Sequence, residues 1–190
     1  MSQNLLTRRT LLASSTIIAA GIGYASRPSN AHTAVLEGEQ PALFSYKPTE
    51  SDFPYEVTRT EAEWREHLDN DELAYGVLRL AETETPKTTD LWLVPHEAGY
   101  HCRGCDLPLY EARWFQFLDK GWVFFHQAVT NSVLFGIDGP VAEYGQAGML
   151  DEGNVVTEVH CRRCGSHIGH HLRVSGMTLH CINGTALKLA

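Results

Sequence analysis

Two short stretches decide the fold: residues 102–105, Cys-Arg-Gly-Cys, and residues 161–164, Cys-Arg-Arg-Cys, with 55 residues between them. A Cys-X-X-Cys turn directs two sulfurs at one ion, and two such turns complete the tetrahedral shell that Zn²⁺ takes in structural sites. A shell of four thiolates leaves no position for water or substrate. We therefore predict one structural zinc ion that cross-links two distant hairpins, bound by Cys102, Cys105, Cys161 and Cys164.

The fifth cysteine, Cys181, lies outside both pairs. Two disulfides are the alternative to zinc, but an odd cysteine fits a free thiol better than a disulfide framework. Strand alternation would place Leu179, Cys181 and Asn183 on one face, with His180 and Ile182 on the other. A thiol beside an amide suits a reaction centre, whereas a lone cysteine is often a small buried hydrophobe. The spacing alone leaves both interpretations open.

Two histidines, His167 and His170, follow the second cysteine pair directly. The metal would fix the backbone that carries them. Histidine supplies hydrogen bonds and proton transfer near neutral pH, which an attacking thiol needs. A Cys-His pair would also suit a protease or an acyltransferase, so these residues do not choose the reaction.

The N-terminus resembles a bacterial twin-arginine export signal. Arg8 and Arg9 precede an apolar run over 11–24, which is too short for a comfortable membrane span. A general secretory signal can also carry two arginines. We expect an export signal over 1–31, an extended lead-in over 32–57 and the functional domain over 58–190. The expected location is periplasmic or otherwise extracytoplasmic, with membrane attachment only through an uncleaved signal.

The charge and the length of the chain limit the classes of partner that we expect it to bind. The first 31 residues contain three arginines and no acid, so the formal charge of −8 becomes −11 once those three charges are removed. An acidic chain argues against nucleic acid and anionic membranes as partners. The remaining length suits a single core, and we expect a monomer.

The pattern of elements predicts a mainly β fold behind a short helical segment. A capping box of Thr60 and Glu63 begins one helix, and a second helix is expected over 73–80. Short runs rich in branched and aromatic residues predict antiparallel strands at 91–94, 121–126, 132–135, 155–160 and 177–182.

Several separated motifs together resemble methionine-R-sulfoxide reductase of the B type. The resemblance covers roughly 58–189 and is carried by residues 60–64, 101–109, 121–122, 157–159, 167–170 and 181–183. It implies a twisted antiparallel fold of the Mss4-like (β-tent) type with a distal structural zinc. It also implies reduction of methionine sulfoxide, protein-bound or free, and here the substrates would include exported proteins.

The resemblance also implies residue roles. Cys181 matches the nucleophile, which becomes a sulfenic acid as methionine leaves. Trp122 matches the aromatic wall against the substrate methyl group. His167 and His170 match the pair that protonates the sulfoxide oxygen, and Asn183 matches the neighbour that orients this network.

Three departures from the family pattern concern the pocket. Lys120 stands where a resolving cysteine is common, so the sulfenic acid would be reduced by an external thiol, thioredoxin-like or glutathione-like. Leu179 stands where an arginine is usual, and we expect Lys120 to replace that cation, so that it lowers the pKa of Cys181 and binds polar atoms of the substrate. Residues 123–126, Val-Phe-Phe-His, alter the wall after Trp122, and we expect Phe125 to contact substrate.

Two other functions remain open. The same fold could be a non-catalytic, zinc-stabilised binding module in which Cys181 is inert. A Cys-His hydrolase would form a covalent acyl adduct instead of a sulfenic acid, but the motifs of such families are not seen. Reactivity of Cys181 near neutral pH discriminates a catalytic thiol from an inert one.

Overall fold

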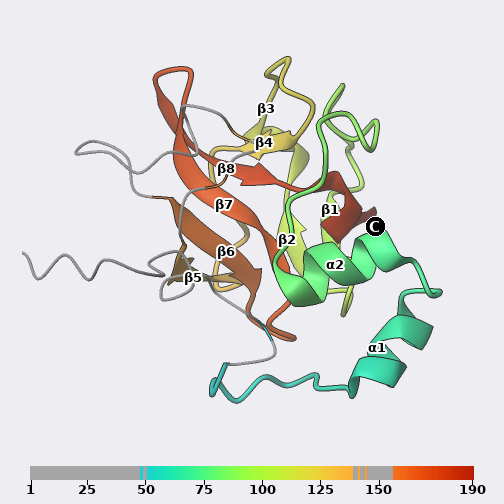
Figure 1. Cartoon of the computed structure of the whole chain (residues 1–190). Helices are drawn as coiled ribbons and strands as arrows, with labels where there is room; N and C mark the ends of the chain where they lie inside the picture. The colour runs from blue at the N-terminus through green and yellow to red at the C-terminus, as the bar shows by residue number, and fades with distance from the viewer. Residues whose placement is uncertain (1–47, 49–50, 139–140, 142–143, 145–155) are drawn as a thin grey trace, which may run out of the picture. The chain divides into compact units, whose positions relative to one another are not determined.

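Six antiparallel strands form the main sheet of the protein (Figure 1), for which a computed structural model describes residues 48, 51–138, 141, 144 and 156–190. These residues all belong to the unit Glu37–Ala190. The strand order is β3-β4-β8-β7-β6-β5. The bounds are β3 Phe115–Gln116, β4 Val123–Phe125, β5 Val133–Ile137, β6 Thr157–Cys161, β7 His167–Val174 and β8 Met177–Ile182.

A smaller sheet joins the C-terminus to the first cysteine pair. It has the order β2-β1-β9, with bounds β1 Tyr100–Cys102, β2 Pro108–Tyr110 and β9 Leu187–Leu189. Figure 1 shows the end of the chain beside β1. Two 3-10 helices, Ala112–Trp114 and Gly184–Ala186, lead into β3 and β9.

Two helices precede the sheets. Helix α1, Glu61–His67, begins at the capping box of Thr60 and Glu63, as the sequence predicts. Helix α2, Glu72–Leu80, is capped by Asp71 and packs against β7 and the 3-10 helix that precedes β9. Among the described residues, no helix is both long enough and apolar enough to cross a bilayer.

The main sheet separates two apolar clusters because successive strand residues point to opposite faces. The larger one, the main core, contains α2 residues together with Val123, Phe125 and Ile182. The smaller one, here the thiol cluster, consists of Trp122, Phe124, Leu172, Val174, Leu179 and Cys181. Leu179 and Cys181 thus share a face, as strand alternation predicts.

The expected antiparallel, mainly β architecture is confirmed, with differences in detail. The predicted strands at 121–126, 132–135 and 177–182 correspond to β4, β5 and β8, and that at 155–160 to β6, with Val155 outside the described residues. The predicted strand at 91–94 is wrong. Leu93 donates its backbone N–H to the Asp90 carbonyl at 3.1 Å in a turn, and Leu93 and Val94 are exposed. The expected export signal lies outside the described residues.

Candidate active site

Four cysteine sulfurs converge and link the two sheets, since Cys102 ends β1 and Cys161 ends β6. The Sγ atoms lie 3.7 Å apart for Cys102 and Cys164 and 3.5 Å apart for Cys105 and Cys161, and all lie within 4.8 Å of one another. A zinc–sulfur bond of about 2.3 Å in a tetrahedral shell separates sulfurs by about 3.8 Å. The four thiols therefore fit a single tetrahedral metal ion, and none forms a disulfide.

Both cysteine turns have the same backbone form. The N–H of Asp106 donates to the Cys102 carbonyl at 2.8 Å, and the N–H of Gly165 donates to the Cys161 carbonyl at 2.8 Å. Asp106 and Gly165, which each follow the second cysteine of a pair, have φ of 66° and 68°. The repeated turn explains how the Cys-X-X-Cys spacing directs both sulfurs of a pair to one point.

Cys181 lies near the centre of the main sheet. It pairs with His170 of β7 on one side and with Phe124 of β4 on the other, and its side chain is 1% exposed. Burial raises the pKa of the Cys181 thiol, a hydrogen bond with Tyr144 opposes this, and the negative charge of Glu84 adds to it. Cys181 is thus a protected thiol that needs a nearby proton acceptor to ionise.

Gly169 interrupts the alternation of β7 and so gathers the histidines. It pairs with Ile182, a main-core residue, yet the preceding Ile168 also packs in the main core. The φ of 155° at Gly169 permits this reversal. His167 is thereby turned to the same side as His170, and their ring centroids lie 5.0 Å apart.

A buried carboxyl group holds His167. Glu158 of β6 contacts His167 Nδ1 through Oε1 at 2.9 Å and His160 Nδ1 through Oε2 at 2.5 Å. Burial raises the pKa of Glu158, with a further contribution from Asp138, and burial lowers the pKa of His167. Both shifts favour the neutral pair, with the proton on the carboxyl group. His167 Nε2 is buried and has no hydrogen-bond partner among the described residues.

The second histidine, His170, has both ring nitrogens engaged. Its Nε2 lies 2.7 Å from Oδ2 of Asp138, which follows β5, and its Nδ1 lies 3.0 Å from the Tyr144 hydroxyl. Because a carboxylate only accepts hydrogen bonds, Nε2 carries the proton and Nδ1 accepts from Tyr144. The Tyr144 ring also meets Trp122 edge-on at 5.0 Å. His170 is therefore oriented as a base toward the thiol cluster.

Glu84 positions both Trp122 and Asn183. Its backbone carbonyl accepts from Trp122 Nε1 at 3.1 Å, and its backbone N–H donates to Asn183 Oδ1 at 3.1 Å. Its carboxylate accepts the N–H groups of Gly184 and Thr185 at 2.6 and 2.8 Å. Burial raises the pKa of Glu84. Asn183 therefore fixes the chain after β8 and connects it to the wall formed by Trp122.

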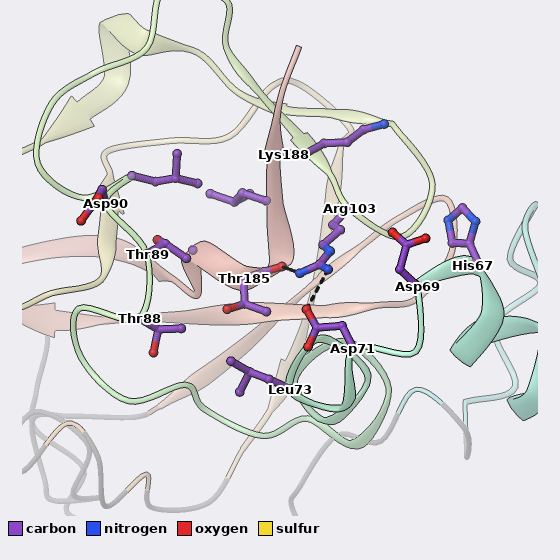
Figure 2. Close-up of a pocket in the computed structure, with 13 residues that line it drawn as sticks. His67, Asp69, Asp71, Leu73, Thr88, Thr89, Asp90, Arg103, Thr185 and Lys188 are labelled. Atoms are coloured by element: carbon purple, nitrogen blue, oxygen red, sulfur yellow. Dashed lines mark hydrogen bonds and ion pairs between the residues drawn. The ribbon is translucent and has the colours of Figure 1, made fainter.

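A separate hollow of about 670 Å³ lies beside the start of α2 and the C-terminal residues. Figure 2 shows Arg103 and Asp71 pointing toward each other there, with their ion pair at 2.8 Å, and Arg103 also reaches the Thr185 carbonyl at 3.4 Å. Cys181 does not line this hollow. The hollow is therefore distinct from the thiol cluster.

Residues 70–190 match the family model described as the SelR domain, which is well over half of the chain. The chain belongs to the SelR domain family. This match confirms the resemblance seen in the sequence, and the cysteine cluster and the thiol cluster both lie within the SelR match.

Three curated relatives of this SelR chain are each named peptide methionine sulfoxide reductase MsrB. Peptide methionine sulfoxide reductase MsrB from Methylibium petroleiphilum is 35% identical over 122 residues, covering 63% of this chain and 78% of that protein. The protein of the same name from Agrobacterium fabrum is 32% identical over 60% of this chain and 76% of its own length. The one from Pseudomonas syringae is 29% identical over 70% and 95%. Among solved structures, the Mis18 'Yippee-like' domain aligns over 48% of this chain and 92% of that chain, with a TM-score of 0.39 and 16% identity.

Two of the predicted pocket residues of this SelR chain lie elsewhere. Phe125 is fully buried in the main core and stacks on Tyr110 at 4.2 Å, so the predicted contact with substrate is wrong. Phe124, one residue earlier, takes the place beside Cys181. Lys120 is exposed in a turn and is not among the groups that shift the pKa of Cys181.

Sequence reasoning missed four residues that build this site: Glu84, Asp138, Tyr144 and Glu158. Glu158 has a detectable signal, because a charged residue within an apolar strand is rarely buried without a partner. The other three residues, Glu84, Asp138 and Tyr144, lie outside regular strands. No periodic pattern indicates there which way a side chain points.

His180 makes stability depend on pH. Burial lowers its pKa from 6.5 to about 4, with His171 adding to the effect, and its Nδ1 meets the Tyr110 hydroxyl at 3.1 Å. The unfolded chain therefore takes up the proton first, so this stabilisation is full above pH 6.5 and is lost as pH falls through about 4. The fall in pKa corresponds to about 3 kcal/mol.

We expect urea-unfolding curves at pH 7 and pH 4.5 to show a smaller loss of stability in His180→Phe than in the unmodified protein. Other acid-sensitive groups are the same in both proteins, so their contribution to the loss of stability cancels in the comparison. An equal acid loss in the two proteins would contradict this assignment.

Proposed function

We propose that this SelR chain is an oxidoreductase that reduces the R epimer of methionine sulfoxide, with Cys181 as its only catalytic cysteine. One observation carries the proposal: Cys181 pairs with His170, and the His167 ring is turned to the same side of the sheet. The Nε2 atom of His167 has no hydrogen-bond partner among the described residues. A nucleophile beside a base and a proton donor is the arrangement that attack on a polar sulfur requires. The names of the relatives support this substrate class.

The reaction transfers one oxygen atom and two electrons. The Cys181 thiolate attacks the sulfoxide sulfur, and the oxygen passes to Cys181 as a sulfenic acid while methionine leaves. The methionine sulfur gains two electrons and the cysteine sulfur loses two. Protonation of the oxygen makes the sulfoxide sulfur electrophilic, which places the proton donor at the centre of the reaction.

His167 and Glu158 are suited to supply that proton. With the proton of Glu158 directed at Nδ1, His167 carries its own hydrogen on Nε2, where it has no acceptor among the described residues. A sulfoxide oxygen would provide the missing acceptor. As negative charge grows on the oxygen, Nε2 gives up its proton and Nδ1 takes the one from Glu158. The relay moves the negative charge from the sulfoxide oxygen to the Glu158 carboxylate, which then accepts the Nδ1–H of His167.

Trp122 serves as the wall for the substrate methyl group. Its indole is fixed by the Glu84 carbonyl and faces the thiol cluster. An aromatic face accepts a methyl group more readily than an oxygen atom, so the wall would orient the sulfoxide and select its epimer. Asn183 holds the adjacent backbone, and in this proposal it acts by positioning.

The sulfenic acid would be reduced by external thiols. The sequence contains five cysteines, and four of them form the cluster, so no further thiol remains for an internal disulfide. One external thiol condenses with the sulfenic acid and releases water, and a second frees Cys181 as an external disulfide forms. A thioredoxin-like or glutathione-like reductant fits this chemistry.

We propose zinc as the metal of the cysteine cluster, because four thiolates at these separations match its preferred shell. The ion would cross-link the two sheets and take no part in the reaction. The paired arginines at the N-terminus support an extracytoplasmic location, where methionine sulfoxide in exported proteins, or free, would be the substrate.

A non-catalytic binding module is the second candidate, and the near-complete burial of Cys181 favours it. Incubation with separate R and S epimers of methionine sulfoxide and a dithiol distinguishes the two. We expect methionine from the R epimer only, and none above the dithiol background with Cys181→Ser. Equal use of both epimers, or an active Cys181→Ser protein, would refute the reductase.

A further inference from the structure

Three influences shift the pKa of the Cys181 thiol: its burial, the Tyr144 hydroxyl and the Glu84 carboxylate. None of the three is a cation. Leu179, two residues earlier on the same face, is apolar and fully buried. A buried thiolate without a cation forms only if its proton passes to a group that can hold it. The thiol cluster must therefore contain a route for that proton.

Tyr144 connects the thiol to a base. Its hydroxyl lies 3.0 Å from His170 Nδ1, and its side chain packs against the thiol cluster that contains Cys181. Because the Asp138 carboxylate accepts a hydrogen bond from the Nε2–H of His170, Nδ1 is an acceptor and the tyrosine hydrogen points to it. The remaining lone pairs of the tyrosine oxygen are then available to accept the S–H proton of Cys181. The donors and acceptors thus run in one direction, from Cys181 through Tyr144 and His170 to Asp138.

Two contacts hold the tyrosine in this position. Its ring meets the Trp122 ring edge-on, at 5.0 Å and 90°, and the ring of His170 at 5.4 Å and 82°. Its backbone N–H donates to the carbonyl of the buried Val141 at 3.1 Å. The hydroxyl is therefore placed by packing on both aromatic neighbours as well as by its hydrogen bonds.

We propose that Tyr144 is a catalytic residue that carries the proton of Cys181 to His170. The S–H bond breaks as a new O–H bond forms on Tyr144, and the original tyrosine O–H breaks as a proton joins Nδ1. The products are a thiolate and an imidazolium ion whose Nε2–H remains paired with the Asp138 carboxylate. The step needs no oxidant or reductant. The inference rests on the proposed function only in calling the ionised thiol a nucleophile toward a sulfoxide.

Alkylation of the metal-loaded full chain by iodoacetamide, mapped to Cys181 by mass spectrometry, tests this without a sulfoxide. Tyr144→Phe keeps the ring and removes the hydroxyl, and we expect it to slow alkylation at pH 7 by about tenfold or more. Tyr110→Phe is the matched control. It removes another phenol that meets a histidine nitrogen, that of His180 at 3.1 Å, on the opposite face of the sheet. We expect Tyr110→Phe to react within about twofold of the unmodified protein.

Tyr144→Ala shows whether Tyr144 carries the proton of Cys181 or only shields the thiol from solvent. If Tyr144 only shields the thiol, Tyr144→Phe reacts like the unmodified protein and Tyr144→Ala reacts faster, and the proposal is overturned. Slower alkylation in both variants supports it. Parallel assays with the R epimer keep the two conclusions apart. Failure of the unmodified protein to reduce the sulfoxide would refute the reductase, while the alkylation rates would still decide the role of Tyr144.

Discussion

Replacement of Gly169 by alanine is expected to destabilise the protein by about 3–5 kcal/mol. A Cβ atom at this position would lie 2.2 Å from the Cys181 carbonyl oxygen and 2.8 Å from Ile182 Cα. Both are backbone atoms of the neighbouring strand β8, so the steric clash can be relieved only if the hydrogen-bonded pairing of β7 with β8 opens. The φ of 155° adds strain for any residue with a side chain. Denaturation with urea, followed by tryptophan fluorescence, measures the loss.

Gly176→Ala provides the matched control for this prediction. Gly176 also has a positive φ, 79°, but a Cβ atom there would meet nothing within 4 Å. We expect it to cost only the backbone strain, about 1 kcal/mol. If the two variants unfold at the same urea concentration, close approach of β7 and β8 is not what requires glycine at residue 169.

Loss of the cluster metal is expected to have an effect of similar or greater size. The ion would join β1 of one sheet to β6 of the other, and its removal leaves four thiols within 4.8 Å of one another. Structural zinc sites contribute folding free energy directly, about 10–16 kcal/mol in the smallest domains. Because this chain also has an apolar core, we expect Cys102→Ser to lower the melting temperature by about 10–15 °C.

Calorimetry and metal analysis of the purified protein measure this effect. Cys181→Ser is the control, since it removes one buried thiol outside the cluster, and we expect its metal content to equal that of the unmodified protein. The disulfide alternative predicts the opposite pattern. A protein that resists chelators and loses stability only with a reductant would show that the cluster cysteines are bonded to one another.

The features that the sequence predicted depend on short stretches of chain. The Cys-X-X-Cys turns, the capping box at Thr60 and the alternation of β8 are each complete within a few residues. The error at Phe125 has a related cause. A strand is correctly placed there, but a shift of one residue exchanges the two faces, and only the pairing of Phe124 with Cys181 fixes which face is which.

The partners of His170 could not be predicted in the same way. Asp138 and Tyr144 lie 32 and 26 residues before it in the sequence and reach it through the tertiary fold. Neither lies in a periodic segment, and tertiary packing alone decides their contacts. The resemblance to methionine-R-sulfoxide reductase of the B type predicted the nucleophile and the two histidines of the site, but it did not predict the tyrosine.

The hairpin formed by β7 and β8 has a consequence for how the protein folds. Ser175 and Gly176 both adopt positive φ, 50° and 79°, in the two-residue connection favoured between antiparallel strands. Only ten residues separate His170 from Cys181 along the chain. Closing so short a loop costs little chain entropy, and hairpins form within microseconds. The base and the nucleophile would therefore lie on neighbouring strands early in folding, before the distant sheets are joined.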